Sequence, residues 1–457
     1  MKVKRLFIVV ALSGILLSGC DLFKKTEPIN DEEEQEEKAE NFDYTHINQE
    51  LQYCYNYFKD TTNFADGTNG FGLTQDRLTS TQMSSIAATG FLLASYPVFV
   101  KENYLTYEKA KEYSLKTIET LLRIQADSNV SYGGCLSHFV TKMDGNRYGS
   151  SEVSTIDTAL AVNGALVAGG YFGGEVLTKA NEFWGNVDFT KFIVQSGGKS
   201  YISMGISAPN KPEDQLGKWD YYAEQMSMYI LGVGNPVEAH RIDPALYKNV
   251  KKENGTYGGI SHIKSWFGSL FTYQYSNAFF NFKDYEDYMG RNYFENSVKA
   301  SQTAYQYCVD NKDKYKTYSE VSWGLTACDT PLGYNGNLGT PPKSYGYNTD
   351  DIKVAGTIAP TAAIGSMPYT PNKSNAALKN YLSIEALCHE RYGLKDSYNL
   401  DFNGNQWFDP DFIGIDKGIE VLQMANFKYD NFVSNCTMEN PNVIRGFENN
   451  GFVKVNG

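Results

Sequence analysis

Residues 155–171, TIDTALAVNGALVAGGY, decide the fold class, because they are apolar on nearly every side and rich in Ala and Gly. A helix of this composition is expected to be buried all round. The next segment, Leu177 to Trp184, carries more polar residues and predicts an amphipathic helix. A buried helix followed by an amphipathic one favours an all-α toroid in which helices form an inner and an outer layer.

Other segments show helical periodicity and predict further helices of these two kinds. They are residues 80–100, 106–126, 219–231, 293–310, 358–367, 375–392 and 415–430. Strand signals are short and are confined to residues 133–140, 198–204 and 257–262. Residues 330–350 are rich in Gly, Asn and Pro and predict a long loop, and such loops in compact domains are often functional. We expect short β-hairpins and long loops at the cleft end of the toroid.

The N-terminal residues MKVKRLFIVVALSGILLSGC have the pattern of a bacterial lipoprotein signal. Three basic residues precede an apolar run that is too short to span a bilayer, and the run ends in Leu-Ser-Gly-Cys. This pattern predicts cleavage of residues 1–19 and acylation of Cys20. The alternatives are an ordinary cleaved signal or a buried apolar helix. We expect an extracytoplasmic protein that is anchored to the cell membrane by its lipidated cysteine.

Composition divides the rest of the chain into a linker and one large domain. Residues 21–40 hold nine acids and three bases, and their only aromatic residue is Phe23. Such a stretch cannot bury enough apolar surface to order itself, so residues 20–45 predict an acidic disordered linker that begins at the lipidated cysteine. Residues 46–457 show no second linker and predict a single catalytic domain, which we expect to act as a monomer.

Charge and metal-ligand patterns exclude several classes of function. The net charge of −12 argues against nucleic acid as a partner, because binding to phosphates needs clustered Lys and Arg. Five histidines without metal-ligand spacing predict neither a metal site nor a cofactor. Six cysteines beyond Cys20 are scattered singly, so buried thiols and disulfides both remain open.

Aromatic residues make up 14% of the chain, and several lie beside Asn, Asp or Gln in segments predicted to be loops. The C–H face of a sugar stacks on an aromatic ring, and its hydroxyls bond to amides and carboxylates. The composition therefore supports carbohydrate binding, although aromatic-rich cores are also common.

Nine strings interleave acids and aromatics with small residues in otherwise apolar segments. They are GFGLTQDR (70–77), SIAATGF (85–91), LSHF (136–139), SEVSTIDTAL (151–160), WDYYAEQM (219–226), FTYQYS (271–276), YSEVSWGLTACD (318–329), GTIAPTAA (356–363) and GIDKG (414–418). In this order they resemble the bacterial glucoamylase-like domain family, which includes the endo-β-1,2-glucanases of glycoside hydrolase family 144. The resemblance runs from about Leu51 to Phe447. It implies an (α/α)6 toroid that cleaves β-1,2-linked glucose chains with inversion.

Glycoside hydrolysis needs one protonated carboxyl and one carboxylate, and two residues are the candidates for these catalytic roles. Glu224 lies among aromatic and apolar residues that disfavour its ionised form, as a general acid requires. Asp416 opens a predicted helix, where the alternative role is a simple cap. The resemblance makes Glu224 the proton donor and Asp416 the base. An inverting pair should lie roughly 6.5–9.5 Å apart.

The remaining polar and aromatic residues of these strings, with Trp407 from a predicted loop, are candidates for binding the sugar. The set is Asp76, Arg77, His138, Glu152, Asp157, Trp219, Tyr222, Gln274, Tyr275, Glu320, Trp323, Asp329 and Trp407. Across the predicted helix start, Glu152 and Asp157 should not face one point equally. We expect Glu152 to point into the cleft and Asp157 to be a buried hydrogen-bonding residue. Glu320 is the reserve catalytic candidate.

Three positions depart from the family's usual pattern. Ala223 stands where relatives usually have Asn, Asn277 where they have His, and Lys417 where they often have Gln. Both candidate catalytic carboxyls are kept, so the departures bear on linkage specificity. The sequence thus predicts a lipid-anchored glycoside hydrolase acting on β-glucan, with β-1,2-glucan as the expected substrate. The alternatives are a non-catalytic surface glycan-binding lipoprotein and a hydrolase of another glucan linkage.

Overall fold

The computed structural model describes residues 42–344 and 353–455. The predicted signal peptide, Cys20 and the linker up to residue 41 lie outside the described residues, as does the end of the predicted 330–350 loop. One compact unit begins at Tyr44, and its first helix begins at Thr45. Among the described residues, no helix combines the length and the apolar character needed to cross a membrane.

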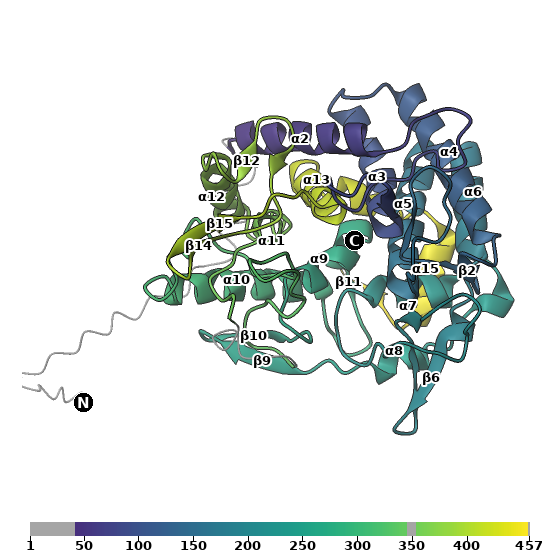
Figure 1. The fold of residues 1–457 in the computed structure, drawn as a ribbon. Coiled ribbons are helices and arrows are strands. Elements are labelled where there is room, and N and C mark those ends of the chain that lie inside the picture. The colour runs from purple at the N-terminus through teal and green to yellow at the C-terminus, as the bar shows by residue number, and fades with distance from the viewer. Residues whose placement is uncertain (1–41, 345–352, 456–457) are drawn as a thin grey trace, which may run out of the picture. The chain divides into compact units, whose positions relative to one another are not determined.

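Helices dominate this unit (Figure 1). Along the chain, buried helices alternate with helices that bury one stripe. The longer helices are α2 (Thr45–Thr61), α3 (Ile86–Lys101), α4 (Tyr107–Gln125), α5 (Thr155–Phe172), α6 (Gly174–Gly185), α7 (Met226–Gly234), α9 (Phe271–Phe279), α10 (Tyr293–Asp310), α12 (Pro371–Leu382), α13 (Gly414–Lys428) and α15 (Pro441–Asn449). The short helices are α8 (Ala245–Asn249), α11 (Pro360–Ile364) and α14 (Phe432–Asn435).

The inner layer is built from α3, α5, α7, α9 and α13, whose residues are almost all buried. The helices α2, α4, α6 and α15 bury one stripe each and cover them. Helix α2 packs on α13, α4 packs on α3 and α5, α6 packs on α5, and α15 packs on α7. The segment 155–171 therefore forms the predicted buried helix, and the amphipathic helix after it lies outside.

The two central helices α3 and α5 approach each other backbone to backbone. A Cβ atom built on Gly164 would lie 1.9 Å from the carbonyl oxygen of Gly90. On the other side of α3, a Cβ on Gly418 of α13 would lie 2.3 Å from Cβ of Phe91. Glycine is thus required at these crossings because any side chain would collide with the neighbouring helix.

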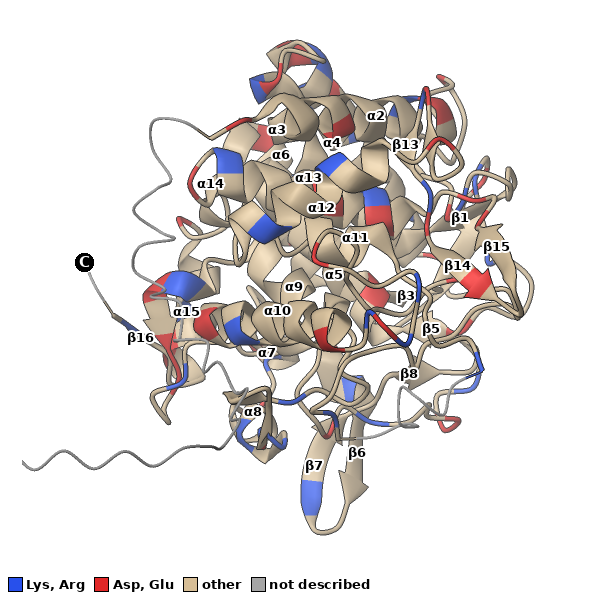
Figure 2. Ribbon diagram, turned by 90° about the vertical axis from the view of Figure 1, so that its left-hand side faces the viewer, with Lys and Arg blue, Asp and Glu red and all other residues tan. Residues whose placement is uncertain are grey.

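The strands are short and, among the described residues, occur only in two-stranded antiparallel pairs. They are β1 (Met83–Ser85) with β4 (Phe139–Thr141), β2 (Ser131–Tyr132) with β3 (Cys135–Leu136), β5 (Val153–Ser154) with β8 (Gly205–Ile206), β6 (Ile193–Ser196) with β7 (Lys199–Ile202), β9 (Asn254–Tyr257) with β10 (Ile260–Ile263), β11 (Tyr285–Glu286) with β16 (Val453–Lys454), β12 (Cys388–His389) with β13 (Gly393–Leu394), and β14 (Tyr398–Phe402) with β15 (Asn405–Phe408). The β6–β7 hairpin projects from the helices, and the basic residues in that view are scattered among acidic ones (Figure 2).

Three predicted helix boundaries are wrong. The helix expected over 219–231 begins only at Met226, because the N–H groups of Trp219 and Tyr222 bond to the distant carbonyls of Ile202 and Lys251. Residues 83–85 form β1 instead of the start of a helix, and the helix expected over 375–392 ends at Leu382 before the β12–β13 hairpin. The helices α2, α9 and α15 were not predicted.

Candidate active site

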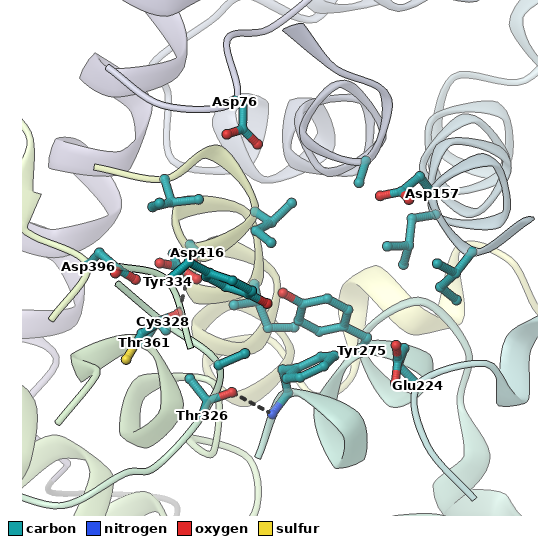
Figure 3. Close-up of a pocket in the computed structure, with 18 of the residues that line it drawn as sticks. Asp76, Asp157, Glu224, Tyr275, Thr326, Cys328, Tyr334, Thr361, Asp396 and Asp416 are labelled. Atoms are coloured by element: carbon teal, nitrogen blue, oxygen red, sulfur yellow. Dashed lines mark hydrogen bonds between the residues drawn. The ribbon is translucent and has the colours of Figure 1, made fainter. Parts of the chain in front are cut away.

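A cavity of about 530 Å³ opens among the inner helices and is lined by segments from the whole length of the chain. This volume lies within the ~300–1,000 Å³ that is usual for small-ligand sites. Seven carboxyl side chains line the cavity, together with apolar residues such as Ile413, Ile415 and Ile419. The seven are Asp76, Glu152, Asp157, Glu224, Asp329, Asp396 and Asp416. Figure 3 shows Glu224 and Asp416 on different walls, with Tyr275 and Tyr334 between them.

Glu224 lies in the turn before α7, not inside a helix. Ser276 Oγ of α9 donates to its carbonyl oxygen at 2.6 Å and accepts from the N–H of Ser227 at 3.0 Å, so α9 fixes the backbone here. Within the described chain, no cation pairs with the Glu224 carboxyl, so Glu224 is not one half of a core ion pair. Burial raises its pKa to about 7, with a further contribution from Asp157, while its own backbone N–H opposes the shift. The site thus holds a carboxyl that is protonated near neutral pH.

Asp416 lies in the first turn of α13 and is 9% exposed at the cavity wall. It does not cap this helix, because the N-cap residue is Ile413. Its Oδ2 is buried without an N–H or O–H donor, and its carboxyl is hydrogen-bonded to that of Asp396. Two buried carboxylates in contact cannot both be ionised, so the pair shares a proton.

The pKa values of both members of this carboxyl pair are raised, chiefly by burial. The pKa of Asp396 rises to about 7, and that of Asp416 is raised well above its usual range by burial and by the neighbouring Asp396. The N–H of Asp329 donates to Asp396 Oδ2 at 2.7 Å, and Ser397 Oγ donates to the same oxygen at 3.3 Å. These donors favour the negative charge on Asp396 and the proton on Asp416.

Behind Asp416, a buried cluster links α13 to α2. Lys417 Nζ lies 2.7 Å from Glu50 Oε1 and 3.1 Å from Glu420 Oε2. Cys54 Sγ donates to Glu420 Oε2 at 3.4 Å. Burial raises the pKa of Glu420 to about 8 despite the nearby ammonium. The unusual lysine of the GIDKG string is therefore neutralised inside the protein and does not reach the cavity.

Arg77 is the cation at the cavity wall that meets several carboxylates. Its Nη1 lies 2.6 Å from Asp329 Oδ2 and 3.7 Å from Asp411 Oδ2, and its Nε lies 3.3 Å from Asp76 Oδ2. Burial opposes the charged form of this guanidinium, but the three carboxylates outweigh burial and raise its pKa. Arg77, Asp76 and Asp329 all line the cavity, as the sequence predicted for sugar-binding residues.

The imidazole of His138 contacts both Glu152 and Asp157, which were not expected to face one point equally. Its Nδ1 lies 2.9 Å from Glu152 Oε1, and its Nε2 lies 3.4 Å from Asp157 Oδ1. Burial lowers the pKa of the imidazole, but the two carboxylates outweigh it and raise the pKa to about 9. Glu152, which precedes β5, and Asp157, in the first turn of α5, therefore meet one imidazole at different nitrogens. Asp157 is the more buried of the two and accepts a hydrogen bond from Ser154 Oγ.

Gln274 and Tyr275 reach the cavity from α9. Gln274 Nε2 donates to the carbonyl of Ala362 at 2.8 Å and to Ser366 Oγ at 2.9 Å, so its amide is already committed to α11 and the turn after it. Tyr275 is 5% exposed, and its ring packs 5.2 Å from that of Phe91.

Five predicted sugar-binding residues do not line the cavity. Trp219 and Tyr222 are buried in the core, where they stack on Trp266 at 5.4 Å and on Tyr293 at 5.4 Å. In the WDYYAEQM string, Trp219 and Tyr222 therefore reflect packing in the core and not contact with a sugar.

The other three residues, Trp323, Glu320 and Trp407, lie away from the cavity for different reasons. Trp323 is fully buried, with its backbone N–H bonded to the hydroxyl of Tyr381. Glu320 is an exposed residue paired with Lys312 at 2.5 Å, which removes it as a reserve catalytic residue. Trp407 lies half-buried on β15.

Among the residues of the cavity wall that sequence reasoning missed, Asp396 and Tyr334 bear most on the chemistry. Asp396 lies between β13 and β14 in a segment without helical pattern, so nothing local marked it. Tyr334 belongs to the predicted 330–350 loop, and only the expectation of a functional loop pointed to it.

Two clusters bring metal-ligand residue types together, and both are already bound by protein donors. Oxygens of Asp329, Asp396 and Asp409 lie within 4.8 Å of one another. The Arg77 guanidinium bonds to the first, and backbone N–H groups bond to the other two. The second cluster is Glu50, Cys54 and Glu420, which contains the Lys417 ammonium.

Comparison with known proteins supports the fold and finds a family model that matches part of the chain. Residues 217–441 match the Glycoamylase family model, described as "Putative glucoamylase". An exo β-1,2-glucooligosaccharide sophorohydrolase (non-reducing end) of Parabacteroides distasonis is 25% identical over 402 residues, which are 80% of this chain and 53% of that protein. The chain thus spans about half the length of this curated relative.

Solved structures share the architecture along nearly the whole chain. A "putative glucoamylase" from Bacteroides uniformis has a TM-score of 0.78 and 24% identity, and covers 91% of this chain and 100% of its own. An endo-β-1,2-glucanase from Chitinophaga pinensis, solved with sophorotriose and glucose, has a TM-score of 0.74 and 22% identity, with 90% and 98% covered. These likenesses confirm the predicted α/α toroid. The stretch that matches the Glycoamylase family model, residues 217–441, contains Glu224, Asp396 and Asp416.

Proposed function

We propose that the protein is a glycoside hydrolase that cleaves β-1,2-linked glucan with inversion, using Glu224 as the general acid and Asp416 as the general base. The observation that carries the proposal is that one cavity is lined by a protonated carboxyl and, on a different wall, by a carboxyl pair that holds a negative charge. Glycosidic cleavage with inversion needs these two functions on opposite sides of one bond.

Glu224 suits the acid role because its proton is retained near neutral pH. As the bond between the anomeric carbon and the leaving oxygen breaks, Glu224 gives its proton to that oxygen. No base of the described chain competes for this proton. The negative charge of Asp157 disfavours ionisation of Glu224 and keeps Glu224 protonated until the substrate is bound.

Asp416 suits the base role because the carboxyl pair carries one negative charge next to the cavity. Water held at this wall attacks the anomeric carbon and gives its proton to Asp416, which passes the proton that it shares to the Asp396 carboxylate. The isoleucines at positions 413, 415 and 419 line the same wall and limit competing solvent. The seven carboxyls and Arg77 offer acceptors and donors for sugar hydroxyls, which a neutral polyhydroxylated substrate needs.

The choice of β-1,2-glucan is supported by the relatives' names: a β-1,2-glucooligosaccharide sophorohydrolase and an endo-β-1,2-glucanase. We include anchoring of the protein outside the cytoplasmic membrane through Cys20 in the proposal, on the support of the N-terminal sequence alone. Membrane fractionation of the full chain and of Cys20→Ser tests the anchor, and equal partition of the two proteins would contradict it.

A linkage panel tests the activity. We expect the protein to release sugars from linear β-1,2-glucan and to leave β-1,3-glucan and α-1,4-glucan intact on thin-layer chromatography. Glu224→Gln should remove this release without lowering the melting temperature. Binding of β-1,2-glucan without release by the parent protein would favour the glycan-binding alternative, and release from another glucan alone would correct the linkage.

A further inference from the structure

Tyr334 follows directly after a tight turn. The turn is closed by two backbone bonds, from Thr330 N–H to Gly333 O at 3.1 Å and from Gly333 N–H to Thr330 O at 2.9 Å. Gly333 has a φ of 95°, which favours glycine. After the turn, Asn335 N–H bonds to the carbonyl of Cys328 at 2.9 Å. The backbone that carries Tyr334 is therefore firmly held.

The side chain of Tyr334, in contrast, is not held. It is 69% exposed although it lines the cavity, whereas Tyr275 on the facing helix is 5% exposed. Among the described residues, no hydrogen bond, ion pair or aromatic contact of the Tyr334 side chain is formed. A large aromatic ring thus stands in the open space of the cavity, with Gly336 beside it: a Cβ atom built on Gly336 would lie 3.6 Å from Tyr334 Cε1.

The hydroxyl of Tyr334 lies between the two proposed catalytic groups. The cavity walls that surround this exposed ring displace bulk water and raise the pKa of the phenol to about 12, and the charges that add to the shift come from Cys328, Glu224, Asp396 and Asp416. Figure 3 shows the rings of Tyr334 and Tyr275 reaching toward each other across the line from Glu224 to Asp416. A sugar that spans both carboxyls must therefore meet the Tyr334 ring.

We propose that Tyr334 is a specificity-determining residue whose exposed ring turns within the cavity and stacks on the glucosyl unit at the cleavage point, where it holds that unit between Glu224 and Asp416. This inference rests on the proposed function. Tyr275 cannot play the part because it is packed against Phe91 and Phe271. The exposed ring supplies the apolar surface that the C–H face of a sugar requires, and a firmly held backbone limits the ordering cost to the side chain.

The test uses the full chain with the Glu224→Gln background, so that binding is measured without turnover. Calorimetric titration with a β-1,2-linked gluco-oligosaccharide compares the background alone with added Tyr334→Ala, Tyr334→Phe and Leu332→Ala. Leu332 is the matched control because it lies in the same turn, is 62% exposed and is not part of the cavity lining. We expect Tyr334→Ala to weaken binding about tenfold, as for an aromatic hot-spot residue, and the other two to bind like the background.

Turnover with Glu224 intact gives a second measurement. Tyr334→Ala should raise KM by a similar factor, and Tyr334→Phe should not. If Tyr334→Ala binds and cleaves like the parent, or binds more tightly, the inference is overturned while the proposed function stands. If the parent protein neither binds nor cleaves the glucan, both are overturned. Melting temperatures of the variants exclude unfolding as the cause.

Discussion

The two walls of the cavity raise the pKa of a carboxyl by different physical means. At one wall, Glu224 stands without a cation, and burial is the main reason that it keeps its proton. At the other, Asp416 is buried against Asp396, and repulsion between the two carboxyls adds to burial. The raised pKa of the single carboxyl at Glu224 provides a proton that can be donated. The Asp396–Asp416 pair, which shares one proton, keeps one negative charge and can accept a second proton.

The first prediction separates the two roles and carries the largest effect. Glu224→Gln and Asp416→Asn should each lower kcat on β-1,2-glucan by ~10²–10⁴-fold, the usual contribution of a general acid or base. An activated aryl glycoside of the same sugar needs no protonation of its leaving group. Glu224→Gln should therefore recover turnover of that substrate, and Asp416→Asn should not. Recovery in both variants, or in neither, would mean that the two walls do not differ in this way.

The second prediction concerns the buried cation behind Asp416. Lys417→Met should lower the free energy of unfolding in urea by ~3–5 kcal/mol, because Glu50 and Glu420 would remain buried without their ammonium. Lys116→Met is the matched control, since the ion pairs of Lys116 with Glu112 and Asp66 and its contact with the Phe71 ring are solvent-exposed at the ammonium, and their loss should cost far less. A similar small loss in both variants would show that the Lys417 cluster does not stabilise this wall.

The third prediction tests the carboxyl pair through stability at different pH values. The folded-state pKa of Asp396 is raised to about 7, above its value in the unfolded chain, so this group stabilises the fold at low pH. That contribution is lost as the pH rises toward 7. Asp396→Asn should therefore lose less stability than the parent between about pH 4 and 7. Thermal melts across this range check it, with the exposed Asp66→Asn as control. Parallel curves for parent and Asp396→Asn would contradict the pair.

The smallest predicted effect concerns the Glu224 wall. The acid must be protonated, so kcat/KM should fall as the pH rises through about 7, the raised pKa of Glu224. Asp157 contributes to that pKa, and Asp157→Asn removes its charge with little change of shape. The basic limb of the pH profile should move to lower pH by a fraction of a unit. An unchanged or raised limb would show that burial alone sets the acidity of Glu224.

The sequence predicted the helices that have a clear hydrophobic pattern. It gave the wrong secondary structure where hydrogen bonds to distant segments determine the backbone conformation. Helix α5 was recognised because apolar and small residues surround it entirely, and α10 was predicted with its observed ends. Residues 219–225 read as a helix in isolation, but their backbone groups bond to segments near residues 202 and 251. Only the folded chain supplies those partners.

The site divides in the same way. Four site residues could be predicted because they are charged residues within apolar strings and because those strings resemble a known family. They are Glu224, Asp416, Arg77 and His138. Trp219 and Trp323 carried the same aromatic signal and proved to be core residues. Asp396 could not be found, because its meaning depends on a contact with Asp416, twenty residues along the chain and across a hairpin.

The crossing of Gly90 and Gly164 acts as a spacer for the catalytic machinery. Helix α3 touches α13, which carries Asp416, and α5 begins with the turn that carries Asp157. The absence of two methyl groups therefore sets the bore of the inner ring. An alanine at either position would push the axes of α3 and α5 apart. It would thereby change the positions of the proposed catalytic carboxyls without contacting them.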